Sequence, residues 1–154
     1  MELEIIEKRE NYLRFVLSGI TPTFANTLRR LIMSEVPTMA IDDVIIIENT
    51  TPLYDEIVAH RLGLIPLKTD LENYVLQSEC ACGGQGCTSC EVSLTLEKLG
   101  EKDIEVVYSS DLLSQDPKIT PVHQNIPVLK MAKNQKIFLE AIARLGRGLD
   151  HAKW

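Results

Sequence analysis

The chain opens with two short stretches in which apolar and polar residues alternate. Leu3 and Ile5 alternate with glutamates, and a polar turn follows at Lys8-Arg9-Glu10-Asn11. After this turn, three apolar residues share one face: Leu13, Phe15 and Leu17. Alternation with a period of two is typical of a half-buried strand, because successive side chains of a strand point to opposite faces. The pattern therefore predicts a β-hairpin.

The next apolar pattern has helical spacing and clear boundaries. Thr21 can cap the helix, with Pro22 at the first helical position, where its missing N–H costs nothing. Pro37 ends the run. The apolar residues that fall near helical spacing are Phe24, Leu28, Leu31 and Ile32, and the other side carries Asn26, Arg29, Arg30 and Met33. We expect a helix from Pro22 to Val36 with a broad apolar face.

Further along, shorter patterns predict further elements. The β-branched residues 44–47 predict a strand, and Thr50-Thr51-Pro52 predicts the start of a second helix, from about Leu53 to Leu62. Gly63 is expected to end this helix as a left-handed C-cap. Alternating strands are expected at 92–96 and 104–106. Residues 136–144 alternate as a strand does, yet their Leu, Glu and Ala favour a helix, so periodicity leaves both open.

Composition sets broad limits on function. The chain has 154 residues, of which 45% are hydrophobic and 25% charged, as is usual for one ordinary domain or two small ones. It has no apolar run long enough to cross a bilayer, and its first residues lack the features of a signal peptide, so we expect a cytoplasmic protein and no membrane contact. A net charge of −6 and 5% aromatic residues predict little direct nucleic-acid contact.

All four cysteines lie close together in the sequence: Cys80, Cys82, Cys87 and Cys90. Their spacing, Cys-x-Cys-x4-Cys-x2-Cys, includes three glycines, which suit tight turns that direct successive sulfurs to one metal. We predict one structural Zn²⁺, since four thiolates close its coordination and leave no position for substrate. An iron–sulfur cluster is the less favoured alternative because the spacing differs from the usual ferredoxin runs. Disulfides or a redox Cys-x-x-Cys would need an oxidising compartment or a thioredoxin-like setting.

Several stretches together resemble one family. Residues 23–30 (TFANTLRR), 55–67 (DEIVAHRLGLIPL), the cysteine segment with 92–96, residues 107–112 and residues 143–154 are similar to D-type (alpha-like) subunits of archaeal RNA polymerases. The eukaryotic counterpart is the third subunit of RNA polymerase II. These motifs span nearly the whole chain in the family's order.

The resemblance implies an α+β fold, with a discontinuous alpha-like dimerisation domain of which only the first part is present, and an inserted small zinc-bearing β-rich domain. The expected boundaries are residues 1–45 for the first part, 46–135 for the insert and 136–154 for a return segment. The second part of the dimerisation domain is expected to begin where this sequence stops.

The resemblance also implies a role. Such subunits form a non-catalytic assembly platform in DNA-directed RNA polymerase: they pair with the small alpha-like subunit L, receive the small subunits N and P, and anchor the large subunits. The active-site aspartates belong to the largest subunit, so no catalytic residue is expected here. The implied partner interface comprises Phe24, Asn26, Leu28, Arg29, Arg30, Leu31 and Ile32.

Two alternatives stay open at this point. Each apolar residue of the first helix could simply be a core residue, and its two arginines could be solvated surface charges. The whole chain could instead be an independent zinc-binding regulatory or redox module. No Ser/His/Asp or Cys/His constellation or phosphate-binding loop stands out in the sequence, which disfavours a free-standing enzyme.

Overall fold

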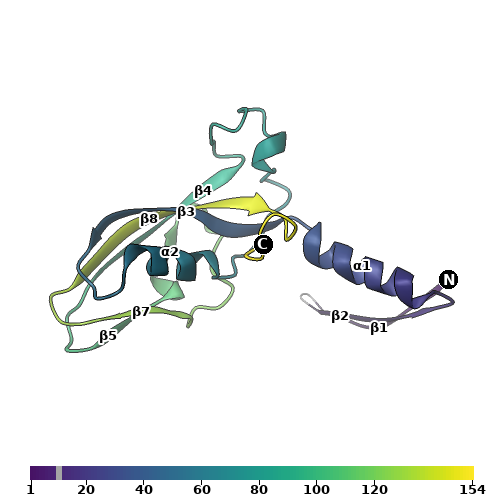
Figure 1. Ribbon diagram of the computed structural model, residues 1–154, viewed down its shortest axis with the longest axis horizontal. Coiled ribbons are helices and arrows are strands. Elements are labelled where there is room, and N and C mark those ends of the chain that lie inside the picture. Colours follow the sequence, from purple (N-terminus) through teal and green to yellow (C-terminus); the bar gives the residue numbers. More distant parts are fainter. Residues whose placement is uncertain (10–11) are drawn as a thin grey trace. The chain divides into compact units, whose positions relative to one another are not determined.

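The computed structural model describes residues 1–9 and 12–154 and divides into two compact units, Met1–Val36 and Pro37–Trp154 (Figure 1). Within this described part of the chain, no helix combines the length and apolar character that a bilayer crossing requires. The first unit contains the predicted hairpin and helix, and the second contains all remaining elements.

In the first unit, strands β1 (Glu2–Arg9) and β2 (Tyr12–Ser18) pair antiparallel, with Leu3 opposite Leu17 and Ile5 opposite Phe15. Helix α1 runs from Pro22 to Ser34. The Thr21 side chain accepts a hydrogen bond from the Phe24 N–H at 3.3 Å, as the sequence predicts for an N-cap. The predicted hairpin and helix are confirmed; of the predicted turn, Glu10 and Asn11 lie outside the described residues.

The second unit is built on a four-stranded antiparallel sheet. Its strand order is β3 (Thr38–Asn49), β8 (Lys136–Gly146), β4 (Glu91–Leu99) and β6 (Leu113–Ser114). Strand β8 pairs with β3 on one side and β4 on the other. Residues 136–144, whose periodicity is compatible with a helix or a strand, thus belong to one of the two inner strands of the sheet.

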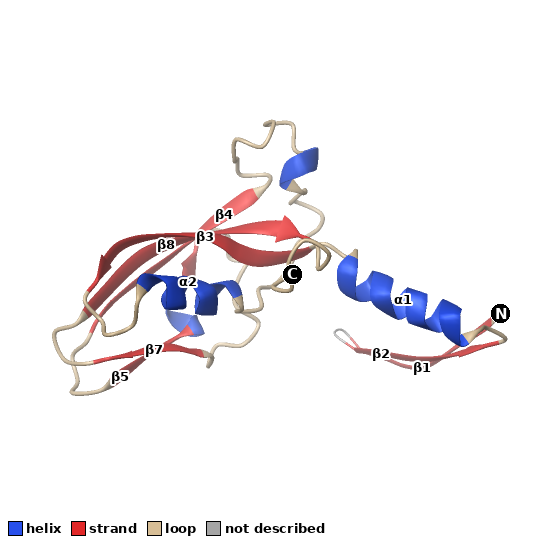
Figure 2. Cartoon of the chain, in the orientation of Figure 1, coloured by secondary structure: helices blue, strands red, loops and turns tan. Residues whose placement is uncertain are grey.

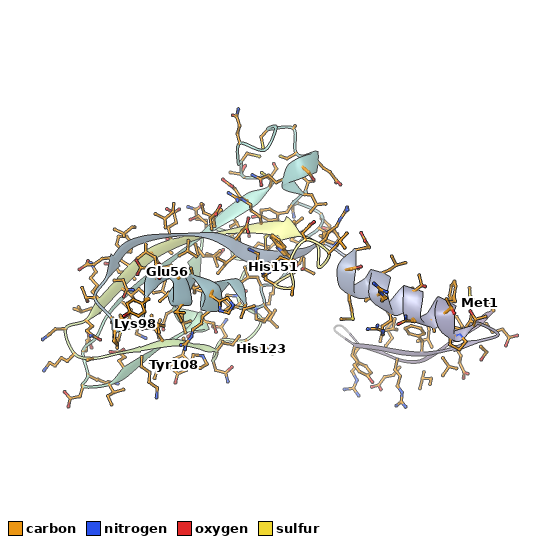
Figure 3. All side chains as sticks on the ribbon, in the orientation of Figure 1. Met1, Glu56, Lys98, Tyr108, His123 and His151 are labelled. Carbon is orange, nitrogen blue, oxygen red and sulfur yellow. The ribbon has the colours of Figure 1, made fainter. Side chains whose placement is uncertain are left out.

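One face of this sheet is covered by a second layer (Figure 2). The layer consists of helix α2 (Asp55–Gly63) and a two-stranded ribbon of β5 (Glu105–Tyr108) and β7 (Pro127–Met131). On the covered side, Lys98, labelled in Figure 3, bridges to Asp111 at 2.9 Å and to Glu105 at 3.6 Å. Two short 3₁₀ helices, Gln77–Glu79 and Ser109–Asp111, complete the unit.

The core lies between these two layers. Its buried members come from every other residue of the sheet strands and from the facing side of α2 and β7: Ile41, Val58, Leu62, Leu94, Leu96, Val128, Leu129, Ile137, Leu139, Ala141 and Ala143. Burying one such aliphatic side chain stabilises the fold by about 1.5–3 kcal/mol relative to leaving it exposed. Buried and half-buried residues alternate along β8 as far as Leu145. This Leu- and Ala-rich segment is a strand because both neighbouring strands supply backbone partners, so that tertiary packing overrides helix propensity.

Three local predictions need correction. The strand predicted at 44–47 extends from Thr38 to Asn49, and its acidic residues hid this extension in the sequence. The second helix begins at Asp55 because Asn49 holds the residues before it in a turn, accepting from the Thr51 N–H at 3.0 Å and donating to the Leu53 carbonyl at 2.9 Å. The left-handed cap at Gly63 is wrong: Gly63 is the last helical residue, and it lies where a Cβ would come 3.4 Å from the Ile41 carbonyl oxygen.

The second compact unit spans both positions at which domain boundaries are expected, 45 and 136. Residues 37–45 and 136–154 fall in the same compact unit as residues 46–135. Strand β8 connects these residues, because it pairs with β3 on one side and with β4 on the other.

Candidate metal centre and interface helix

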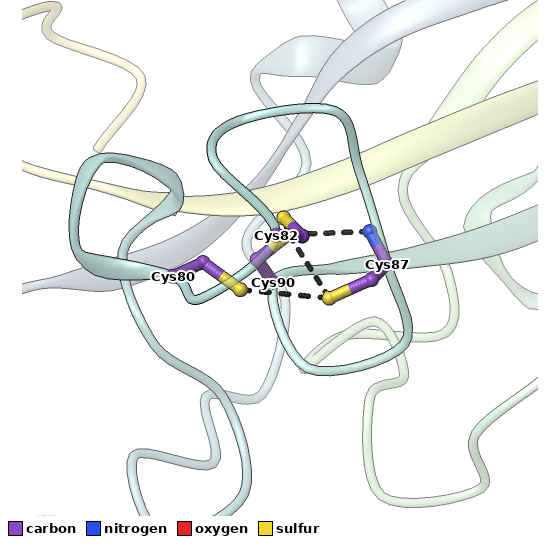
Figure 4. Close-up of side chains that lie close together, drawn as sticks. All are labelled: Cys80, Cys82, Cys87 and Cys90. Atoms are coloured by element: carbon purple, nitrogen blue, oxygen red, sulfur yellow. Dashed lines mark hydrogen bonds between the residues drawn. The ribbon is translucent and has the colours of Figure 1, made fainter.

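The four cysteines lie on a loop that leaves the sheet at the start of β4 (Figure 4). Cys80 ends the 3₁₀ helix Gln77–Glu79, and Cys90 directly precedes β4. Cys90 is buried, whereas the other three are half-buried. The Cys87 N–H donates to the Cys90 sulfur at 3.3 Å, and the Cys90 N–H donates to the Cys87 carbonyl at 3.0 Å. The sequence prediction that these residues form one cluster is confirmed.

The distances between the sulfurs fit one tetrahedral metal ion. All four Sγ atoms lie within 4.8 Å of one another, with separations of 3.5 Å (Cys80–Cys87), 3.7 Å (Cys82–Cys90) and 3.8 Å (Cys87–Cys90). A tetrahedron with metal–sulfur bonds of about 2.3 Å has edges of about 3.8 Å. All four cysteines are free. The cluster could therefore hold one metal ion with four sulfur ligands.

Glycines make this compact loop possible. Gly83, Gly84 and Gly86 have φ values of 66°, 84° and 88°, in the left-handed region that side-chain-bearing residues rarely adopt. The Gln77 side chain donates to the Gly84 carbonyl at 2.9 Å and ties the loop to the preceding 3₁₀ helix. The loop geometry anticipated from the glycines is confirmed.

The thiols differ in how readily they give up protons. Burial raises the pKa of Cys90 to about 12, while a hydrogen bond with Cys80 lowers the pKa of Cys82 to about 6. A cation in the cluster requires all four as thiolates, so its binding would release protons and would weaken in acid.

A partly buried ion cluster connects this loop to the sheet. Glu91, the first residue of β4, accepts from the Nε of Arg144 at 3.2 Å. Arg144 on β8 also donates to Asp43 at 2.7 Å and Asp42 at 3.2 Å on β3. A Cβ on Gly86 would overlap the Glu91 carboxylate, so the cysteine loop lies directly against this cluster. These residues were not predicted from the sequence; the available signal was an arginine at a polar position of an alternating strand.

The second candidate site is helix α1 in the first unit. None of its residues is buried, and Phe24, Leu31 and Ile32 are each about half exposed. Among the described residues, no core covers Phe24, Leu31 and Ile32. A groove of about 410 Å³ runs between the helix and the hairpin, lined by Phe15, Leu17, Ile20, Ala25, Leu28, Arg29 and Ile32.

Some polar residues of this helix already form hydrogen bonds within it. Arg29 donates to the Asn26 side-chain oxygen at 3.0 Å and to the Met33 sulfur at 3.3 Å, so it is held along its own helix. Arg30 is exposed. Of the predicted interface residues, the structure thus brings Asn26 and Arg29 into contact and places Leu28, Arg29 and Ile32 along the groove.

Comparison with known proteins agrees with this architecture. The family model described as RNA polymerase Rpb3/RpoA insert domain matches residues 39–154, which is the second unit almost from end to end. The chain belongs to this family.

Similar whole proteins point the same way. The chain is 50% identical to the DNA-directed RNA polymerase subunit Rpo3 of Methanosarcina acetivorans and 51% identical to that of Methanosarcina mazei, each over 155 residues and 100% of this chain. It is 46% identical to the Rpo3 subunit of Archaeoglobus fulgidus over 99% of this chain. The chain spans 57% of the length of each of these relatives. The family match and these relatives extend the resemblance seen in the sequence motifs to both units.

Proposed function

We propose that the chain is a non-catalytic part of a DNA-directed RNA polymerase and serves as an assembly platform in transcription. The observation that carries this proposal is the insert-domain match over residues 39–154, together with similarity to Rpo3 subunits over the whole of this chain and 57% of their length. The polymerase activity belongs to the complex, and we assign no catalytic residue to this chain. Its place of action is the cytoplasm.

The first unit is the part that we assign to partner binding. A hairpin and a single helix bury little between them, and the apolar side chains that they leave exposed are those that a stable assembly has to cover. We infer that this unit is the first part of the alpha-like dimerisation domain and pairs with the small subunit L. Subunits N and P and the large subunits complete the assembly. The contact residues are Phe24, Asn26, Leu28, Arg29, Arg30, Leu31 and Ile32.

The cysteine cluster has a structural role in this proposal. Cys80, Cys82, Cys87 and Cys90 would hold one Zn²⁺, which supplies fixed tetrahedral bonds in a loop with almost no apolar core of its own. Zinc is favoured over an iron–sulfur cluster because sulfur separations of 3.5–3.8 Å match a single central ion.

Affinity purification through a tag on the chain, from the cells that produce it, tests the assembly role. The large polymerase subunits and subunit L are expected to co-purify in equal molar amounts. Recovery of the chain without them would favour an independent zinc-binding module instead.

A matched pair of variants tests the interface. Ile32→Glu in α1 should abolish recovery of subunit L, because a charge would be buried at the contact. Ile104→Glu in the second unit, where the side chain is also exposed, should leave recovery unchanged. Elemental analysis of the same material should give one zinc per chain; iron with visible absorption would overturn the zinc assignment.

A further inference from the structure

The face of the four-stranded sheet opposite α2 and the β5–β7 ribbon has no covering layer among the described residues (Figure 3). Strand pairing places the side chains of this open face in rows. One row crosses all four strands and consists of Ile45, Glu140, Thr95 and Leu113. The rows on either side are Asp43, Ile142 and Ser93, and Glu48, Phe138 and Glu97.

Large apolar side chains lie around Glu140 on the open face. Phe138 and Ile142 flank Glu140 along β8 and are half-buried by their neighbours alone. Ile45 is 52% exposed and Leu113 is 72% exposed. Antiparallel sheets often leave one face to water, but such a face is then usually polar. The large apolar side chains among these polar ones, Ile45, Leu113, Phe138 and Ile142, depart from that pattern and indicate a surface that is covered in use.

The charges on this face are unbalanced toward acid. Its carboxylates are those of Asp43, Glu48, Glu91, Glu97 and Glu140, while its cations are Lys136 and Arg144. Both cations are already engaged: Lys136 with Glu48 at 3.2 Å and Glu97 at 3.4 Å, and Arg144 with Asp43 at 2.7 Å and Glu91 at 3.2 Å. Glu140, at the centre, accepts a hydrogen bond from Ser93 and has no cation within 4 Å in the described part of the chain.

This charge pattern indicates which kind of molecule can bind the open face. A nucleic acid or an anionic membrane would be repelled by the excess carboxylates, and a second copy of the same face would bring like charges together. We propose that the open face binds a segment of another protein in which apolar side chains are flanked by Lys or Arg. The apolar residues cover Ile45, Phe138 and Ile142, and a basic residue meets Glu140. This surface lies in the second unit and is separate from the α1 interface proposed above.

Site-specific photo-crosslinking in the full chain tests the proposal. Phe138 is replaced by p-benzoylphenylalanine in the tagged chain, the complex is purified and irradiated, and the crosslinked peptides are identified by mass spectrometry. The control places the same crosslinker at Ile104, which is exposed but lies outside this face. Crosslinks from position 138, above the control, to an apolar segment flanked by Lys or Arg are the expected result.

Charge variants provide the second measurement. Glu140→Lys should lower the crosslinking yield from position 138 by about tenfold or more, since a like charge opposite a basic residue weakens binding strongly. Glu140→Gln, which keeps the shape, should lower it less, and thermal unfolding confirms that each variant is folded. Crosslinks to nucleic acid, to a second copy of the chain or to a segment without basic residues would overturn the proposal, as would equal yields at positions 138 and 104. Co-purification of the large subunits is scored separately, so failure of the polymerase assignment is distinguishable from failure of this one.

Discussion

Arg144 and Glu91 form an ion pair that joins the inner strand β8 to the base of the cysteine loop. The Nε of Arg144 donates to Glu91 at 3.2 Å, and the two side chains are 18% and 27% exposed. Because Arg144 also reaches Asp42 and Asp43 on β3, one guanidinium connects three strands. A planar guanidinium with several donors suits this position, whereas a lysine could not satisfy the same set of carboxylates.

Replacing Arg144 should therefore destabilise the second unit. Arg144→Met leaves three neighbouring carboxylates without their shared cation, and we expect a loss of about 2–4 kcal/mol in the free energy of unfolding. Urea denaturation followed by circular dichroism measures the loss.

The matched control for that variant is Lys118→Met. Lys118 pairs with Asp70 at 3.1 Å but is 62% exposed, so its loss should cost clearly less free energy of unfolding than the loss of Arg144. Equal effects of the two substitutions would mean that the Arg144 cluster is no more than a surface ion pair.

Two glycines of the cysteine loop allow the cost of backbone strain to be separated from the cost of a side-chain overlap. Gly83→Ala and Gly86→Ala both place a side chain at positive φ, which costs about 1 kcal/mol or more. A Cβ on Gly83 meets nothing within 4 Å, whereas a Cβ on Gly86 overlaps Glu91. We expect Gly86→Ala to be the more destabilising and to weaken metal retention against a chelator. If Gly83→Ala releases metal as readily, the contact with Glu91 has no part in holding the loop.

Much of the first unit and of the cysteine cluster could be predicted from sequence because their signals are local. Thr21 with Pro22 marks the helix start, and the cysteine spacing with its glycines marks the loop. The inner position of β8 could not be predicted, since it depends on partners roughly 45 and 100 residues earlier in the chain. The ion pairs of Asp42 and Asp43 could not be predicted either. These two residues interrupt the apolar pattern of β3, and their partner Arg144 lies about 100 residues later in the chain.

The exposure of α1 could not be predicted from the sequence for a different reason. Its apolar stripe predicts a buried face, and the sequence cannot tell burial within the chain from burial against a partner. The structure resolves this for the chain itself, because Phe24, Leu31 and Ile32 remain about half exposed.

Loss of one cysteine should unfold the metal loop and spare the first unit. In Cys87→Ser the cluster keeps three thiols, and its closed tetrahedral site is lost. Hydrogen exchange should show lost protection over the loop and the start of β4, with β1, β2 and α1 unchanged, because the two compact units have separate contacts. Ser89→Ala, on the same loop but without a thiol, is the control. Loss of protection throughout residues 1–36 would show that the units unfold together.

Asp70 gives the second unit an acid-sensitive contact. Hydrogen bonds from the Asn73 side chain at 2.7 Å and from Lys118 at 3.1 Å lower the pKa of Asp70 from 3.8 to about 2. A carboxyl whose pKa is lower in the folded state contributes stability that is fully present above pH 4 and is lost as the pH falls toward 2. In Asp70→Asn this part of the pH dependence should disappear.

Carboxyl NMR titration measures the Asp70 pKa directly and is independent of metal release in acid. The expected midpoint is about 2 in the native protein. In Asn73→Ala the carboxylate remains, but the hydrogen bond that lowers its pKa most is lost. The midpoint should therefore move toward 3.8. Lys118→Met should move it in the same direction by a smaller amount, because the exposed ammonium is screened by solvent. A native midpoint near 3.8, or one that neither variant changes, would show that these hydrogen bonds do not stabilise the ionised form in solution.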